Sequence, residues 1–160
     1  MEDCKVQYKK IMAAIDLSKY SEDTFLHAYA LAKALNAELT VLYVIDTHYM
    51  DTVERYAGVA GFDRDALLAS QREETQARIE KELLSKAPDY KARVEFREGL
   101  PWEEILNAVK EENPDLLVVG SKGHSDVAGV LFGSVAEKVQ RHAGCPVMII
   151  RGPEHCRIYG

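Results

Sequence analysis

Apolar residues fall into five short runs along the chain, and segments of helical periodicity separate these runs. Most of the runs are nearly continuous, which is typical of strands buried on both faces of a parallel sheet. The third run alternates apolar and charged side chains and predicts a strand with one solvated face at a sheet edge. The runs cover residues 10–15, 39–45, 92–97, 115–119 and 147–150.

Between the runs, apolar residues recur at three- and four-residue spacing, which predicts amphipathic helices. The first helix is expected over residues 22–36, capped by Ser21, and its core-facing residues are Phe25, Ala28, Tyr29, Ala32 and Leu35. Further helices are expected over residues 65–87, from Pro101 onward, and over residues 134–142. Strands that alternate with helices predict an α/β fold, a doubly wound parallel sheet with helices on both faces.

Residues 46–65 show neither helical nor strand periodicity, and they are expected to form an irregular segment. This segment would be either a flap over a ligand or part of a dimer contact. Asp46, His48 and Asp51 are weak candidates for metal binding, because their loop spacing matches no common ligand pattern. No metal site is therefore predicted. The polar tail, residues 152–160, is expected to be loosely held.

The length of 160 residues favours one compact domain over residues 1–160. The formal net charge of −6 disfavours nonspecific nucleic-acid binding, which needs Lys and Arg to neutralise phosphates. No apolar run approaches the roughly 20 residues of a membrane-spanning helix, and no secretory signal is visible. Three widely spaced cysteines favour neither a zinc site nor a disulfide framework, so a cytoplasmic location is expected.

The stretch from Gly120 to Val135 carries the clearest candidate chemistry, with four glycines, serines and a lysine between a strand and a helix. Backbone N–H groups at such a junction, with the positive end of the helix dipole, suit an anion such as phosphate. The Walker phosphate loop and the Rossmann glycine fingerprint are both absent. What remains is Gly-x2-Gly-x9-Gly-Ser, from Gly120, Gly123, Gly133 and Ser134. Local chemistry alone leaves a flexible surface loop as the alternative.

This spacing resembles the glycine motif that the nucleotide-binding branch of the universal stress protein family carries after its fourth strand. Residues 13–18 resemble that family's first strand, residues 42–46 its second and residues 145–151 its last, so the resemblance covers nearly the whole chain. It implies a Rossmann-like sheet in the order 3-2-1-4-5. Asp16 and Gly120 would then face one crevice at the carboxyl ends of the first and fourth strands.

The resemblance implies an ATP site in this crevice. Val44 and Val119 would flank the adenine, with the backbone at Ala14 and Ile15 assisting, and Asp16 would accept a hydrogen bond from the ribose or the base edge. Magnesium or manganese would be carried on the phosphates. The expected nucleotide-binding residues are Ala14, Ile15, Asp16, Val44, Val119, Gly120, Ser121, Lys122, Gly123, Gly133, Ser134 and Val135.

Residue chemistry suggests a role for each part of the phosphate loop. Gly120 and Gly123 would let the backbone approach the ligand, because they lack a Cβ. Ser121 and Ser134 would donate hydroxyl hydrogen bonds, and the first N–H groups of the following helix would bind the same anion. Lys122 would either neutralise phosphate charge or remain a solvated side chain.

Three functions are compatible with these residues. The first is an ATP-binding regulatory module of the stress response, the second a slow ATPase or autophosphorylating enzyme, and the third a nucleotide-independent dimeric interaction module. His124 and Asp126 are the local candidates for general acid–base chemistry, and no catalytic residue is predicted. A homodimer is expected through residues 147–150, because relatives pair this apolar edge strand antiparallel across a two-fold axis.

Overall fold

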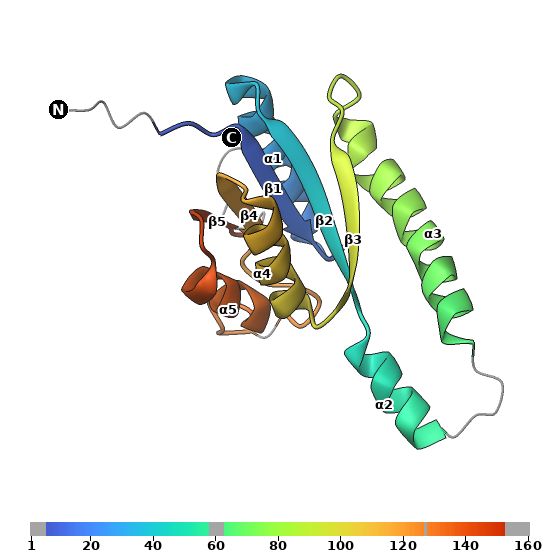
Figure 1. The fold of residues 1–160 in the computed structure, drawn as a ribbon. Coiled ribbons are helices and arrows are strands. Elements are labelled where there is room, and N and C mark those ends of the chain that lie inside the picture. Colours follow the sequence, from blue (N-terminus) through green and yellow to red (C-terminus); the bar gives the residue numbers. More distant parts are fainter. Residues whose placement is uncertain (1–5, 58–62, 127, 153–160) are drawn as a thin grey trace.

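The computed structural model of the chain describes residues 6–57, 63–126 and 128–152 as a layered α/β structure (Figure 1). Its elements in chain order are β1 (Lys10–Ile15), α1 (Ser21–Leu35), β2 (Glu38–Asp46), α2 (His48–Ala57), α3 (Arg64–Glu82), the short 3-10 helix η1 (Leu84–Lys86), β3 (Arg93–Gly99), α4 (Pro101–Glu112), β4 (Leu116–Gly120), α5 (Ser134–His142) and β5 (Val147–Ile150). Apart from Gly152, the tail expected to be loosely held lies outside the described residues.

The five strands form one parallel sheet in the order β3-β2-β1-β4-β5, which confirms the expected fold class and strand order. β1 is central: Ala13 lies opposite Val41 of β2 on one side and opposite Val118 of β4 on the other. Because the strands are parallel, their carboxyl ends meet at one edge of the sheet. The chain leaves β1 towards β2 and returns on its other side as β4, so a topological switch point lies at that edge.

Alternate residues of the central strand face two separate cores. On one face, Ile11 belongs to a cluster with Phe25 of α1 and Ile79 of α3. On the other face, Met12 belongs to a cluster with residues of α4 and with Val139 of α5. In Figure 1, α4 and α5 lie in front of the sheet and α1 lies behind it. Helices on both faces explain why the central strands read as continuous apolar runs.

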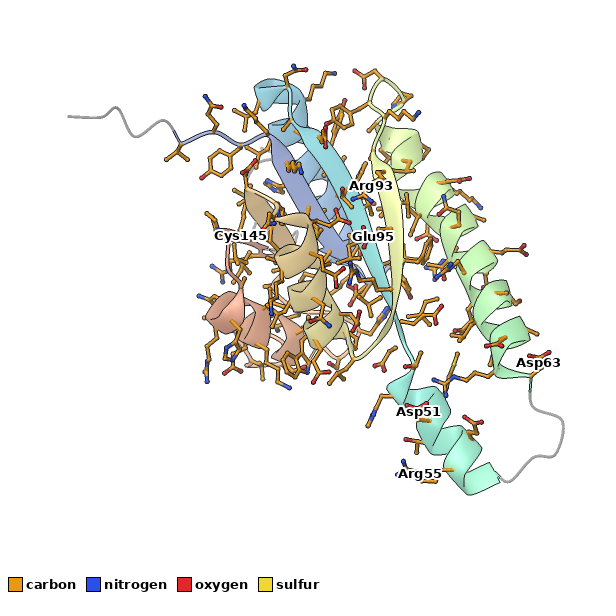
Figure 2. All side chains as sticks on the ribbon, in the orientation of Figure 1. Asp51, Arg55, Asp63, Arg93, Glu95 and Cys145 are labelled. Carbon is orange, nitrogen blue, oxygen red and sulfur yellow. The ribbon has the colours of Figure 1, made fainter. Side chains whose placement is uncertain are left out.

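Local sequence sets several helix ends. Asn36 and Asn113 adopt the left-handed conformation, with φ of 51° and 48°, and end α1 and α4. Pro101 lies in the first turn of α4, where its missing N–H removes no helical hydrogen bond. Asp63, labelled in Figure 2, caps α3 because its Oδ1 accepts the N–H of Ala66 at 3.0 Å.

The expectation of an irregular segment over residues 46–65 is wrong for much of its length, because α2 occupies residues 48–57. Asp46, the last residue of β2, lies just before this helix, and its Oδ1 accepts the N–H of the first helical residue, His48, at 2.9 Å. The β-branched and aromatic residues of the segment have low helix propensity, which hid the helix in the sequence. Met50 anchors it in a small buried cluster with Ile45 of β2. Figure 1 shows α2 beyond the carboxyl ends of the strands, with α3 running back alongside β3.

Two expectations for α1 also need correction. The helix begins at Ser21 itself, so Ser21 is its first residue and does not cap it; its hydroxyl bonds instead to the carboxylate of Asp16. Leu35, expected to face the core, is 46% exposed. It is the last residue of α1, where Asn36 turns the chain towards β2, so it no longer lies against the sheet.

Candidate functional site

A cavity of about 340 Å³ opens at the carboxyl ends of β1, β2 and β4, at the switch point of the sheet. Its volume lies within the range of roughly 300–1,000 Å³ that is typical of small-molecule sites. Eleven of the twelve predicted nucleotide-binding residues line it, namely Ala14, Ile15, Asp16, Val44, Val119, Gly120, Lys122, Gly123, Gly133, Ser134 and Val135.

The loop after β1 is built around Asp16. Its Oδ1 accepts the N–H of Ser18 at 2.9 Å and the hydroxyl of Ser21 at 3.1 Å. The hydroxyl oxygen of Ser21 in turn accepts the N–H of Asp16 at 3.2 Å. Asp16 therefore organises a turn, as a short acidic side chain after a strand commonly does, and it also lines the cavity.

Ser121 is the predicted residue that the structure does not bring to the cavity. It is 5% exposed, and its backbone N–H donates to the carbonyl of Ile150 at 2.8 Å. Its own carbonyl accepts the N–H of Gly133 at 2.7 Å. The first bond ties the start of the glycine loop to β5, and the second joins the two ends of the loop to each other. Ser121 thus fixes the base of the loop, and this geometry lends no support to a direct role of its hydroxyl in ligand binding.

The glycines of the motif allow protein segments to approach each other closely. A Cβ on Gly123 would lie 2.3 Å from Asp16 Oδ2, and a Cβ on Gly120 would lie 3.0 Å from Tyr20 Cβ. A Cβ on Gly133 would meet loop backbone at 3.3 Å. The missing Cβ atoms were expected to let a ligand approach, but protein atoms lie at these places. The motif first lets the glycine loop dock on the Asp16 loop and so builds the cavity.

The amino end of α5 contributes backbone donors. Gly133 is the N-cap residue, and Ser134, Val135 and Ala136 of the first turn line the cavity. The first N–H groups of an α-helix have no partner within the helix, and glycine has no side chain to cap them. These amides and the positive end of the helix dipole favour an anion at this end of the cavity.

Charged side chains join the two loops at the cavity rim. His124 Nε2 lies 2.6 Å from the backbone oxygen of Asp16, and because a carbonyl only accepts, the ring donates from Nε2. Asp126 pairs with Lys122 at 2.8 Å and with Lys19 at 2.6 Å. Hydrogen bonds from Lys122 and then Lys19 hold the pKa of Asp126 well below its usual range, so this side chain stays ionised at physiological pH.

Another part of the wall is apolar. Leu42, Val119 and Ile105 belong to the buried cluster beneath α4, and Val44 packs against that cluster. Such a surface suits the flat face of an aromatic base. Tyr43 also lines the cavity, and burial, together with the charge of Asp16, raises the pKa of its phenol, so the hydroxyl keeps its proton.

The cavity also has lining residues that were not predicted as ligand contacts. They come from the first turns of three helices, from β2 and from the glycine loop, namely Tyr20, Ser21, Thr24, Leu42, Tyr43, Asp46, Pro101, Ile105, His124, Ser125 and Ala136. The three-residue spacing of Ser21 and Thr24, and the four-residue spacing of Pro101 and Ile105, place each pair on one helix face. That spacing is the signal that the sequence offers, but the sequence does not fix which face meets the cavity.

The weak metal candidates have other partners. Asp46 accepts the N–H of His48 at the start of α2, and Asp51 pairs with Arg64 at 2.6 Å. Across residues 6–57, 63–126 and 128–152, no group of three or more His, Cys, Asp or Glu side chains is placed to hold a metal ion. In the same described ranges, no helix combines the length and the apolar character that crossing a membrane requires.

Comparison with known proteins agrees with this architecture. A profile of the universal stress protein family matches residues 7–151. Universal stress protein MJ0531 of Methanocaldococcus jannaschii is 31% identical over 149 residues, which cover 92% of this chain and 84% of that protein.

Solved structures show the same relationship. Hypothetical protein MJ0577, of the same archaeon, is 28% identical, with a TM-score of 0.74 over 91% of this chain and 97% of that one. A universal stress protein in complex with cAMP, 24% identical, shares the fold with a TM-score of 0.62 over 91% of this chain and 98% of that one. From the family match over residues 7–151 and these relatives, we conclude that the chain belongs to the universal stress protein family.

Proposed function

We propose that this chain is an ATP-binding regulatory protein of the stress response, and that it holds the nucleotide in the cavity at the ends of β1 and β4. One observation carries the proposal. The Asp16 loop and the glycine loop touch through His124 across 108 residues of sequence, and both line one cavity of suitable size. The relative that binds cAMP supports an adenine nucleotide as the class of ligand.

The base would lie against the apolar part of the wall. Val44 and Val119 would flank it, and the backbone at Ala14 and Ile15 would lie beside it. Asp16 would accept a hydrogen bond from the ribose or the base edge. Because a carboxylate repels phosphate, Asp16 belongs to the nucleoside half of the ligand.

The phosphates would lie at the amino end of α5. Ser134, Val135 and Lys122 line that region, so two amides, a hydroxyl and an ammonium group would face the phosphate oxygens. Magnesium or manganese would be carried on the phosphates, where it would neutralise part of their charge.

Replacing Ser134 by Asp tests this placement. Asp is favourable in the first turn of a helix, so the fold should be retained, but its carboxylate would repel the phosphates. ATP at 100 times its Kd should stabilise the wild type by about 2.7 kcal/mol. In a thermal melt this corresponds to a Tm shift of roughly 5–10 °C. The Ser134→Asp variant should show no shift with ATP.

Ser134→Ala is the matched control, because it removes the hydroxyl without adding charge; most of the ATP shift should remain. Mass spectrometry of small molecules released from freshly purified protein should show an adenine nucleotide. A wild type that carries no nucleotide, and whose Tm does not respond to millimolar ATP, would refute the proposal and favour a nucleotide-independent dimeric module.

Slow ATP hydrolysis or autophosphorylation is the remaining alternative. His124 bonds to the carbonyl of Asp16, and Asp126 pairs with two lysines, so both candidates for acid–base chemistry already have partners within the protein. This arrangement favours binding without turnover. A single-turnover assay with labelled ATP separates the two roles, since turnover that His124→Ala abolishes would establish an enzyme.

We also propose that the protein is a cytoplasmic homodimer that pairs through β5. This strand is the last in the sheet and pairs with β4 along one edge, and its residues Val147, Met148 and Ile149 are half-buried. Antiparallel pairing with β5 of a second copy would give hydrogen-bond partners to the backbone N–H and C=O groups on the other edge of the strand. Light scattering at micromolar concentration should give the mass of a dimer, and a monomer would refute this pairing. Cell fractionation checks the location.

A further inference from the structure

Two lysine side chains converge on the carboxylate of Asp126. Lys19 Nζ lies 2.6 Å from its Oδ2, and Lys122 Nζ lies 2.8 Å from its Oδ1. Hydrogen bonding by Lys122 first, then by Lys19 and by Tyr20, lowers the pKa of this carboxyl group. Two ammonium groups around one anion have the chemistry of an anion-binding site. Here a side chain of the protein itself is the anion.

The fold holds Tyr20 and Lys122 in place at the cavity. Tyr20 is 3% exposed, and a Cβ built on Gly152 would lie only 2.8 Å from its ring. The side chain of Lys122 is 18% exposed, and the residue lies two positions after the end of β4. Tyr20 and Lys122 both line the cavity, so the anion site is continuous with the proposed nucleotide site.

Asp126 is held less firmly than Tyr20 and Lys122. It lies on the glycine loop between β4 and α5, outside any helix or strand, and it is exposed. Backbone in such a loop rearranges more readily than a strand end or a buried aromatic ring. Of the four groups, the carboxylate is therefore the one that an incoming anion can displace.

We propose that Lys19, Tyr20 and Lys122 bind the terminal phosphate of a nucleoside triphosphate, and that Asp126 occupies this subsite until the phosphate displaces it. The inference rests on the proposed nucleotide site. Lys19 and Tyr20 lie outside the glycine motif, so the motif alone does not lead to them.

Displacement of Asp126 makes the site selective for the number of phosphates. A terminal phosphate offers three oxygens and about two negative charges, whereas a carboxylate offers two oxygens and one charge. ATP therefore competes well with Asp126, and adenosine, which has no phosphate, does not compete at all. Because Asp126 stays ionised at physiological pH, any pH dependence of this competition comes from the terminal phosphate, whose second pKa is about 6.

Asp126→Asn tests the subsite, because the amide keeps the shape of the side chain and removes the competing charge. Isothermal titration calorimetry with ATP, adenosine and inorganic tripolyphosphate gives the readout. ATP and tripolyphosphate should bind the variant about three- to tenfold more tightly than the wild type. Adenosine should bind both proteins equally. Lys19→Gln should act in the opposite direction: it should weaken ATP binding about three- to tenfold and leave the affinity for adenosine unchanged.

Asp89→Asn is the matched control. Asp89 also pairs with a lysine, Lys33, and its Oδ1 accepts a hydrogen bond from the hydroxyl of Tyr29 at 2.7 Å. None of these three residues lines the cavity. This variant should leave all three affinities unchanged. Thermal melts verify that each variant is folded, and Lys19→Gln, at an exposed side chain, decides the question should Asp126→Asn not fold.

Unchanged affinities of Asp126→Asn for both ATP and tripolyphosphate would overturn the proposed subsite. The two proposals fail separately. If the wild type binds no nucleotide but Asp126→Asn still binds tripolyphosphate more tightly than the wild type does, the ATP-binding function is refuted and the anion site stands.

Discussion

A cavity lies at each end of the sheet, and the two cavities use charged residues in opposite ways. The cavity at the carboxyl end measures about 340 Å³ and the one at the amino end about 160 Å³. The smaller cavity is the more densely charged: Lys10, Glu38, Arg93 and Glu112 all line it. A charge count alone would therefore favour the amino-end cavity over the proposed nucleotide site.

The difference lies in the partners of these charges. At the amino end, Arg93 pairs with both Glu112 and Glu95, and Figure 2 shows Arg93 and Glu95 side by side on the sheet. Asp115 accepts the backbone N–H groups of Lys9 and Lys10 at 2.7 and 2.8 Å. These charged side chains stabilise the fold by bonding to each other or to the backbone. At the carboxyl end, glycines and a helix terminus leave backbone donors facing the cavity, which is what a ligand requires.

Among the variants considered, Gly123→Ala should have the largest effect, because it disrupts the contact between Gly123 and Asp16 that forms the larger cavity. The new Cβ would lie 2.3 Å from Asp16 Oδ2 and would push the two loops apart. Overpacking of this kind destabilises by about 1–3 kcal/mol. We also expect at least a roughly tenfold loss of ATP affinity, equivalent to about 1.4 kcal/mol. Urea unfolding and calorimetric titration measure the two effects.

Gly144→Ala is the control for this variant, because no atom lies within 4 Å of a Cβ at that position. Its stability should stay within about 0.5 kcal/mol of the wild type. A Gly123→Ala protein that binds ATP as the wild type does would show that loop docking is not required for the site.

Asp115→Asn should have an intermediate effect, and only on stability. Hydrogen bonds from the amides of Lys9 and Lys10 lower the pKa of Asp115. A lowered pKa stabilises the fold above the unfolded value of about 3.9, and that contribution is lost as the pH falls through the folded pKa. The variant should lose about 1 kcal/mol near neutral pH. Nucleotide affinity should not change.

Chemical denaturation over a pH series checks this expectation. The difference in unfolding free energy between wild type and Asp115→Asn should narrow on acidification below about pH 4. A difference that stays constant with pH would mean that the amide hydrogen bonds do not act through the ionised carboxylate.

Glu112→Gln should have the smallest effect. Hydrogen bonding to Glu95, followed by burial, raises the pKa of Glu112, so the two carboxyl groups compete for one site beside Arg93. Relative to the ionised carboxylate, the amide gains a donor for Glu95 but loses the ion pair with Arg93, and these changes oppose each other. Stability at neutral pH should change by less than about 1 kcal/mol. A loss several times larger in the same unfolding assay would show that the amino-end ion pairs dominate stability.

Much of the fold follows from sequence pattern. The continuous apolar runs around Ala13 and Val118 predict strands buried on both faces, and the glycine motif with Asp16 identifies the edge where the cavity lies. These features are local or repeat along the chain, so a reader of the sequence can find them. The strand order itself came from the family resemblance, because pattern alone does not fix which strands are neighbours.

The details of the site depend on contacts that no local pattern encodes. That Gly123 lies against Asp16, and that Ser121 turns towards β5, depends on how two distant loops dock. Lys19 meets Asp126 for the same reason. Helix α2 was not predicted because its sequence has low helix propensity, and the tertiary burial of Met50, which outweighs that propensity, cannot be read from the local sequence.

The bonds from Lys9 and Lys10 to Asp115 also bear on how the protein is made. They span 106 and 105 residues, and the central strand cannot gain its second neighbour until β4 has left the ribosome. Topologies dominated by such distant pairings fold slowly. A nascent chain that ends before Leu116 has an unpaired edge on β1 and only half of the proposed nucleotide site, so that site is complete only when synthesis is nearly finished.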